Sequence, residues 1–120
     1  MIRSTPPTRR PGARRIQREA RLLLVELKGR SAALEHADGS LIRACVAFAV
    51  PQGGTTPTRT ARILRSVAAS RATTMDGHRA RAAAFILWDE GDLLERACVD
   101  GILEEVLLRA ILIDLVLGPP

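Results

Sequence analysis

The chain has almost no aromatic side chains, and this restricts the kind of core that it can build. Its 120 residues include one Trp, two Phe and no Tyr, although 47% of the residues are hydrophobic. The core must therefore be filled by Leu, Ile, Val and Ala, which suits helices that pack closely together. A chain of this length is one domain by size and can bury roughly two-thirds of its unfolded surface. We expect a mainly α protein of four or so helices.

Basic and acidic side chains are separated along the chain. Residues 1–81 hold 16 basic and 5 acidic residues, a net charge of +11, whereas residues 82–120 hold 2 basic and 8 acidic residues, a net charge of −6. A GC-rich coding sequence would also make arginine abundant, but it would not sort charges by position. The separation therefore points to a polyanion, an acidic protein or an anionic surface as a partner for the first part. The alternative is that the acidic end packs onto the basic end within one domain.

Residues 1–12 differ in composition from the rest of the chain. They are mainly Pro, Thr and Arg with little to bury, so they predict a flexible basic arm that includes Arg9 and Arg10, ahead of a single helical domain over residues 13–120. No acidic residue precedes Glu19, which a mitochondrial presequence would also show, but three prolines argue against the amphipathic helix of such a signal. We expect a cytoplasmic protein, with the mitochondrial matrix as the alternative.

The segment after the arm has the pattern of an amphipathic helix that ends at Gly29. Apolar residues share one side of it, at Ile16, Ala20, Leu23, Leu24 and Leu27. A basic stripe occupies the opposite side, at Arg14, Arg18, Arg21 and Lys28, with Arg15 next in sequence to Arg14. Arginine forks bind phosphate oxygens well, so these residues are candidate nucleic-acid contacts.

Residues 31–50 fit two structures. Asp38-Gly39 is a favourable hairpin turn, and the alternating apolar residues after it would share one face of a strand. A short buried helix that begins at Ser40 and stops before Pro51 is the alternative, favoured by the alanines. We favour the β-hairpin, within a fold that is mainly α, and an α+β fold is the alternative.

Two further helices are predicted after the loop over residues 51–58. The first has an apolar side opposite a second basic surface, at Arg59, Arg62 and Arg65. The next is expected to start with Asp76 as its N-cap and Met75 as a hydrophobic staple.

The last helix is expected over residues 92–117, with Asp92 and Glu95 as a capping box and Gly118 after its end. Its second half is apolar nearly all round, so it must be enclosed, and a second copy of the helix accounts for this best. Glu105 and Arg109 are spaced to pair with each other. The candidate self-association residues are Leu108, Ile111, Leu112, Leu115 and Val116. The alternatives are the centre of a monomeric bundle or a foreign partner.

Catalytic and metal-binding patterns are sparse. His36, His78, Cys45 and Cys98 match no zinc-binding spacing, and both cysteines are interpreted as reduced core residues. Gly53-Gly54 is not followed by the lysine of a phosphate-binding loop. We expect no enzyme activity, no metal and no cofactor.

The resulting hypothesis is a small non-enzymatic protein that binds the nucleic-acid backbone through its first two-thirds and self-associates through its last helix. The shortage of aromatic residues argues against binding by base stacking. The alternative is a helical adaptor or assembly subunit whose basic surface binds an acidic protein. Charged residues interrupt the longest apolar run, so no membrane span is expected.

Overall fold

The computed structural model describes residues 9–33, 37–49, 57–99 and 101–118, with side chains for most of them. Within these ranges the chain forms six helices and no strand, so the mainly α prediction is confirmed. The helices are α1 (Arg9–Ala33), α2 (Gly39–Ala49), α3 (Pro57–Ala69), α4 (Met75–Trp88), α5 (Asp92–Val99) and α6 (Leu103–Leu117).

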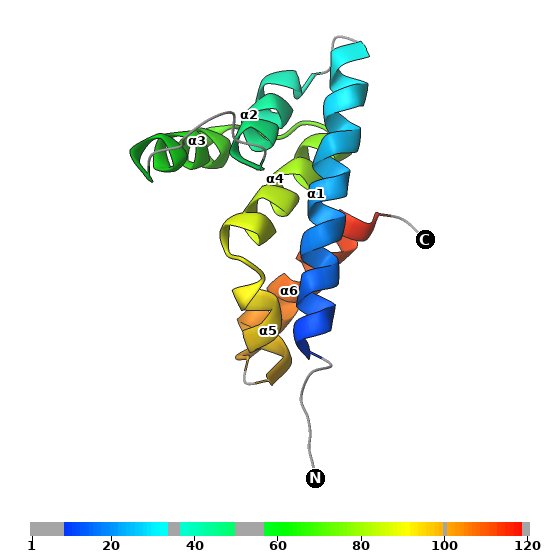
Figure 1. Ribbon diagram of the computed structural model, residues 1–120, viewed down its shortest axis with the longest axis vertical. Helices are drawn as coiled ribbons and strands as arrows, with labels where there is room; N and C mark the ends of the chain where they lie inside the picture. Colours follow the sequence, from blue (N-terminus) through cyan, green and yellow to red (C-terminus); the bar gives the residue numbers. More distant parts are fainter. Residues whose placement is uncertain (1–8, 34–36, 50–56, 100, 119–120) are drawn as a thin grey trace.

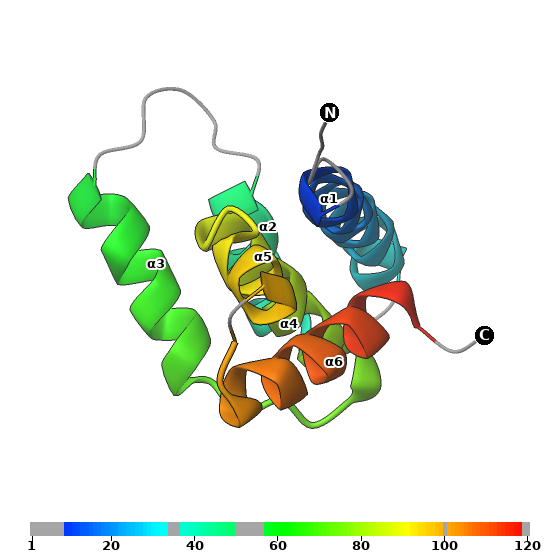
Figure 2. The same cartoon turned by 90° about the horizontal axis from the view of Figure 1, so that it is seen from below.

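The helices pack around α1 and α4 (Figure 1). α1 is the longest helix, and α2 and α4 lie beside it. α3 packs against α2 and stands out on the side away from α1. α6 crosses α4 and α1 on the face of the molecule that points away from the viewer in Figure 1. It also contacts the short α5 (Figure 2). Both views place α1 and α3 on opposite sides of the layer that α2 and α4 form.

The core is aliphatic, as the composition predicts. The apolar side of α1 is buried as expected, at Ile16, Ala20, Leu23, Leu24 and Leu27. Ile42 and Cys45 of α2 and Ile86 of α4 belong to the same cluster. α4 otherwise contributes mostly buried alanines, at Ala80 and at positions 82–84, and their small size lets neighbouring helices approach closely.

The expected end of the first helix at Gly29 is wrong. α1 continues through Gly29 to Ala33, and a Cβ at Gly29 would have open space around it. A glycine inside a helix costs about 0.5–1 kcal/mol relative to alanine, and burial of the apolar side of α1 offsets a cost of this size. At its other end α1 begins at Arg9, within the range expected for the arm, and residues 1–8 lie outside the described part of the chain.

The β-hairpin expected within residues 31–50 is also wrong, because the described part of this segment after α1 forms helix α2. The Ile42 amide donates to the Asp38 carbonyl at 2.9 Å, so Asp38-Gly39 begins a helix. The buried residues of α2 recur with helical spacing, at Leu41, Ile42, Cys45 and Val46. Contact of this face with α1 and α4 favours the helix over the strand.

The single helix expected over residues 92–117 is divided into α5 and α6, which pack against each other. A tight turn precedes α5, with Gly91 at a φ of 75°. The Leu93 amide donates to the carboxylate of Asp89, which therefore has the capping role that the sequence assigned to Asp92. The N-cap of α4 is also a different residue from the predicted one, Thr74 in place of Asp76.

Polar contacts join α5 and α6 across the break between them. Arg96 Nε lies 2.7 Å from Asp92 Oδ2, and its guanidinium also pairs with Glu105 of α6. Arg109 Nε donates to the Leu94 carbonyl at 3.2 Å. Glu105 and Arg109 therefore hold α6 against α5, in place of the pair with each other that the sequence predicted.

Candidate interaction surfaces

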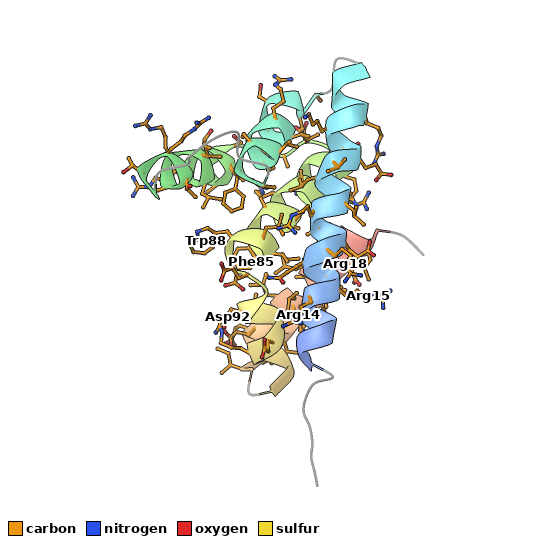
Figure 3. All side chains as sticks on the ribbon, viewed as in Figure 1. Arg14, Arg15, Arg18, Phe85, Trp88 and Asp92 are labelled. Atoms are coloured by element: carbon orange, nitrogen blue, oxygen red, sulfur yellow. The ribbon has the colours of Figure 1, made fainter. Side chains whose placement is uncertain are left out.

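The basic stripe predicted on the first helix lies on the exposed side of α1, opposite the core. Its cationic side chains are all exposed: Arg14, Arg15, Arg18, Arg21 and Lys28. Figure 3 shows the first three on the N-terminal half of α1. Among the described residues no carboxylate pairs with any of these four arginines. Arg9 and Arg10 form the first turn of α1, and their side chains lie outside the described residues.

The two flanks of α1 differ in charge. Arg30 is about half-exposed and lies on the flank of α1 away from Lys28. It pairs with Glu26 at 3.3 Å and with Asp76 of α4 at 3.7 Å. Val25, which is 54% exposed, lies within the basic stripe between Arg21 and Lys28 on the same side of the helix. The stripe is therefore cationic with one exposed apolar residue near its C-terminal end, whereas the flank that holds Arg30 carries paired charges.

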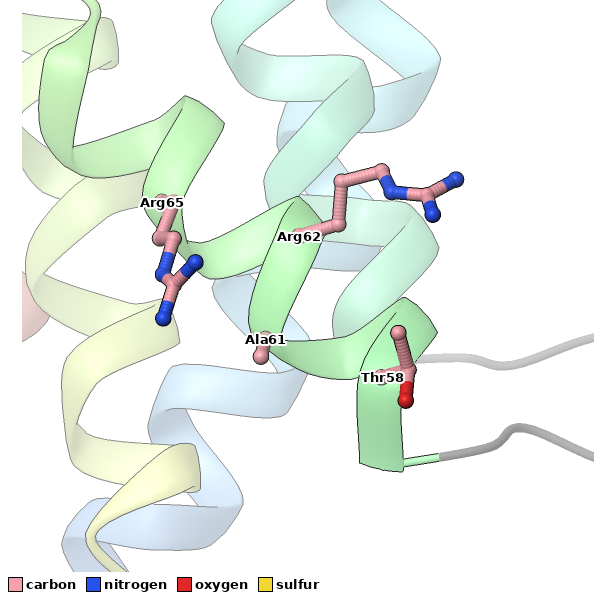
Figure 4. A pocket seen from close by; sticks show the side chains of 4 residues that line it. All are labelled: Thr58, Ala61, Arg62 and Arg65. Carbon is pink, nitrogen blue, oxygen red and sulfur yellow. The ribbon is translucent and has the colours of Figure 1, made fainter.

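α3 carries the second predicted basic surface. Arg59, Arg62 and Arg65 are all exposed. Arg62 and Arg65, with Thr58 and Ala61, line an open hollow of about 530 Å³. Figure 4 shows their two guanidinium groups pointing in different directions. The two groups do not converge on a common point, so the side chains that line this hollow do not form an anion-binding site.

The two basic surfaces are not brought together. α1 and α3 flank the α2 and α4 layer from opposite sides, and α3 packs mainly against α2 (Figures 1 and 2). The stripe on α1 is therefore the larger continuous cationic surface, and α3 forms a separate one.

Two arginines of α4 have structural roles that the sequence analysis missed. Arg79 donates to the carbonyls of Leu115 and Val116, with Nε 2.8 Å from the Leu115 oxygen. Arg81 donates to the Ser70 carbonyl just after α3. Both guanidinium groups bind at the carbonyl end of another helix, where a positive charge is favourable. Their spacing among buried alanines in "HRARAAA" was the available signal.

Among the residues that the structure describes, Asp38 is the buried carboxylate, with 4% of its surface exposed. It accepts hydrogen bonds from the amides and hydroxyls of Thr73 and Thr74, at 2.7 to 3.1 Å. The Thr74 hydroxyl contributes most to lowering the pKa of Asp38 well below its usual value, and it outweighs the opposing effect of burial. The carboxylate is thus a fixed anion and not a proton donor or acceptor near neutral pH.

The described side chains form no recognisable catalytic or metal centre. Burial raises the pKa of the Cys45 thiol to about 12, so the thiol is protonated and inert within the core. His78 is exposed, whereas the side chains of His36 and Cys98 lie outside the described residues. No three His, Cys, Asp or Glu side chains within the described ranges come together in a way that could hold a metal ion.

The predicted self-association residues divide between the core and the surface. Leu112 and Val116 are buried within this chain, so the prediction that they contact a second chain is corrected. Leu115 is half-buried, whereas Leu108 and Ile111 are exposed. The sequence analysis missed four other exposed large apolar residues of α6, at Leu103, Val106, Leu107 and Leu117.

α6 therefore packs one side into the core and leaves an apolar side exposed. The buried side contacts α4 and α1. No helix in the described part of the chain is long and apolar enough to cross a membrane.

No protein-family model matches the chain, and no curated protein or solved structure shows significant similarity to it.

Proposed function

We propose that the chain is a small non-enzymatic protein that binds the phosphate backbone of nucleic acid through α1 and self-associates through α6. The observation that carries this proposal is the stripe of exposed cations on α1, four of which have no acidic partner among the described residues. Guanidinium groups bind phosphate oxygens through paired, charge-assisted hydrogen bonds. From Arg14 to Lys28 the stripe extends about 21 Å along the helix axis, the length of roughly six phosphates of one duplex strand.

The proposed contact reads the backbone and not the bases. Trp88, the chain's one tryptophan, lies at the end of α4 on the side of the molecule away from Arg15 and Arg18 (Figure 3). Base stacking on aromatic rings therefore has no platform beside the stripe. Phosphate contacts give affinity that depends weakly on sequence and strongly on salt.

One further feature supports a binding role in place of catalysis, and another supports a location in the cytoplasm. The candidate chemical groups, Asp38 and Cys45, are both enclosed, one by hydrogen bonds and the other by apolar side chains. A free buried thiol fits a reducing compartment. The basic residues of α3 provide a separate contact for a second segment of nucleic acid on the other side of the molecule.

An acidic protein is the second candidate partner, and one observation favours it. Leu22 and Val25 are more than half exposed on the outer side of α1, next to the basic stripe. An acidic amphipathic helix could cover these apolar side chains while its carboxylates bind the arginines. A competition experiment distinguishes the two partners. Unrelated duplexes displace one another from a protein that binds the phosphate backbone, but they do not compete with a protein partner for its apolar contacts.

The test is the salt dependence of binding to a generic duplex, measured by fluorescence anisotropy. If about six phosphates are contacted, affinity falls roughly a thousandfold between 50 and 200 mM salt. Changing Arg14, Arg18 and Arg21 together to Gln should about halve the slope of log affinity against log salt.

The matched control changes Arg30, Arg43 and Arg71 to Gln, which removes the same charge from exposed positions outside the stripe. We expect this control to retain most of the slope and the affinity. Equal losses in the two triple variants would show that net charge alone drives binding. An unchanged slope in the stripe variant would exclude α1 as the binding surface.

A further inference from the structure

α6 has an exposed apolar strip on the side opposite its buried residues. The strip, called here the outer face of α6, consists of Leu103, Val106, Leu107, Ala110, Ile111 and Asp114. Leu103 is 68% exposed, Leu107 57% and Ile111 55%. At 100° per residue these three lie within about 80° of one another, and the buried Leu112 lies on the opposite side from Leu103. Asp114 is the one polar side chain within the strip.

The exposed apolar area suits a small protein interface. The four large apolar side chains of the outer face, Leu103, Val106, Leu107 and Ile111, are each 43 to 68% exposed. Burying one such side chain completely removes roughly 60–120 Å² of apolar surface, from about 1.5–3 kcal/mol at about 25 cal/mol per Å². These four together thus expose roughly 130–270 Å², which is less than the apolar area of about 450 Å² that each partner contributes to a standard interface. The outer face can therefore form a weak, small dimer.

The first turn of α6 carries Glu104 and Glu105, and Glu105 is paired with Arg96 of α5. Ile102 occupies the N-cap position of α6 and makes no side-chain hydrogen bond to the first turn, so the amides there have no side-chain cap. Such a helix end favours a carboxylate. Asp114 lies on the same face, about 16 Å further along the axis from Leu103. Glu104 lies about 80° around the helix from Asp114, at the edge of the face, where it can remain in water.

We propose that the outer face of α6 binds the same face of a second copy of this chain, with the two α6 helices antiparallel about a two-fold axis between Leu107 and Ala110. In this arrangement Leu107 packs against the small Ala110 of the partner subunit, so the helices can approach closely. Asp114 then lies at the first turn of the partner subunit's α6. This inference gives a geometry to the self-association in the proposed function, and it does not depend on nucleic-acid binding.

The first test is the oligomeric state by sedimentation velocity over a range of concentrations, without nucleic acid. The wild-type chain should dimerise with a micromolar dissociation constant. Leu107→Glu should weaken dimerisation by roughly a hundredfold or more, because it places an unpaired charge in the contact. It should leave the helical circular dichroism signal intact, since Leu107 is exposed in the single chain.

Val25→Glu is the matched control, since it adds the same charge at an equally exposed apolar position on α1. It should dimerise like the wild type but bind a duplex more weakly, whereas Leu107→Glu should bind a duplex through α1 as a monomer. Equal effects of both variants on dimerisation would overturn the assignment of the contact to α6. A wild-type chain that is monomeric at several hundred micromolar would overturn the dimer and leave the proposal for α1 standing.

The second test addresses the antiparallel arrangement. Asp114→Lys should weaken dimerisation about tenfold or more, because it places a cation at the partner's helix N-terminus. The double variant Leu103→Glu with Asp114→Lys should dimerise more tightly than Asp114→Lys alone, since each introduced lysine then faces an introduced glutamate. If the second substitution gives no recovery, the antiparallel arrangement is wrong.

Discussion

The hydroxyl of Thr74 donates a hydrogen bond of 2.7 Å to the carboxylate of Asp38, and so joins two helix starts that are 36 residues apart in sequence. Asp38 directly precedes α2, while Thr74 is the N-cap of α4 and accepts from the Gly77 amide at 3.1 Å. The buried carboxylate therefore lies near the positive ends of two helices, where a negative charge is favourable. This contact fixes α2 against α4 at the centre of the fold.

Asp38→Asn should lower the free energy of unfolding by roughly 2–4 kcal/mol. The substitution keeps one acceptor oxygen but removes the charge and replaces the other oxygen with a donor that faces donors of Thr73 and Thr74. Urea denaturation followed by circular dichroism measures the loss. Asp114→Asn, an exposed position, is the control and should change the stability of the monomer by less than about 0.5 kcal/mol. Similar small effects at both positions would contradict the proposed importance of Asp38.

The stabilising effect of Asp38 should disappear in acid. Its pKa is lowered in the folded chain, so the unfolded chain takes up the proton first as pH falls. Its contribution is fully present above the unfolded pKa of about 4 and is lost as pH falls towards the lower folded pKa. The stability difference between the wild type and Asp38→Asn should therefore be constant from pH 7 to 5 and shrink below pH 4. A difference that stays constant to pH 2 would show that the pKa of Asp38 is not lowered by folding.

Gly77→Ala and Gly29→Ala should change stability in opposite directions. A Cβ at Gly77 would lie 2.0 Å from Asp38 Oδ2, so the methyl group must displace the buried carboxylate. We expect a loss of roughly 2 kcal/mol or more. A Cβ at Gly29 would meet nothing within 4 Å, and alanine there should add about 0.5–1 kcal/mol. Thermal unfolding of both variants checks this, and stabilisation by both would show that Asp38 does not pack against α4.

Neighbouring residues of α6 should respond differently to truncation. Leu112 is 7% exposed in the core, so Leu112→Ala should cost about 2–5 kcal/mol of folding stability. Ile111 is on the outer face, and Ile111→Ala should cost less than about 1 kcal/mol when measured at a concentration where the chain is monomeric. Denaturation at low micromolar concentration tests this, and equal losses would mean that α6 presents a different side to the core.

The buried side and the basic stripe of α1 could be predicted from the sequence. Both depend only on the period of the α-helix, which places Ile16, Ala20 and Leu27 on one side and Arg14, Arg18 and Arg21 on the other. The aliphatic core followed from composition in the same way, because a chain with three aromatic residues has little else to bury. Such features are local, and tertiary packing did not alter them.

The tertiary structure decided which side of α6 faces inward, where the last helix breaks and that residues 39–49 form a helix. A helix that is apolar nearly all round has no preferred buried side, so contact with α4 and α1 selects Leu112 and Val116 and leaves Leu107 and Ile111 exposed. The partners of Asp38 were likewise inaccessible to sequence reasoning, because a carboxylate next to a glycine fits a hairpin turn as well as a helix start. Only long-range packing brings Thr73 and Thr74 to it, since hydrogen bonds between residues 35 and 36 positions apart leave no local pattern.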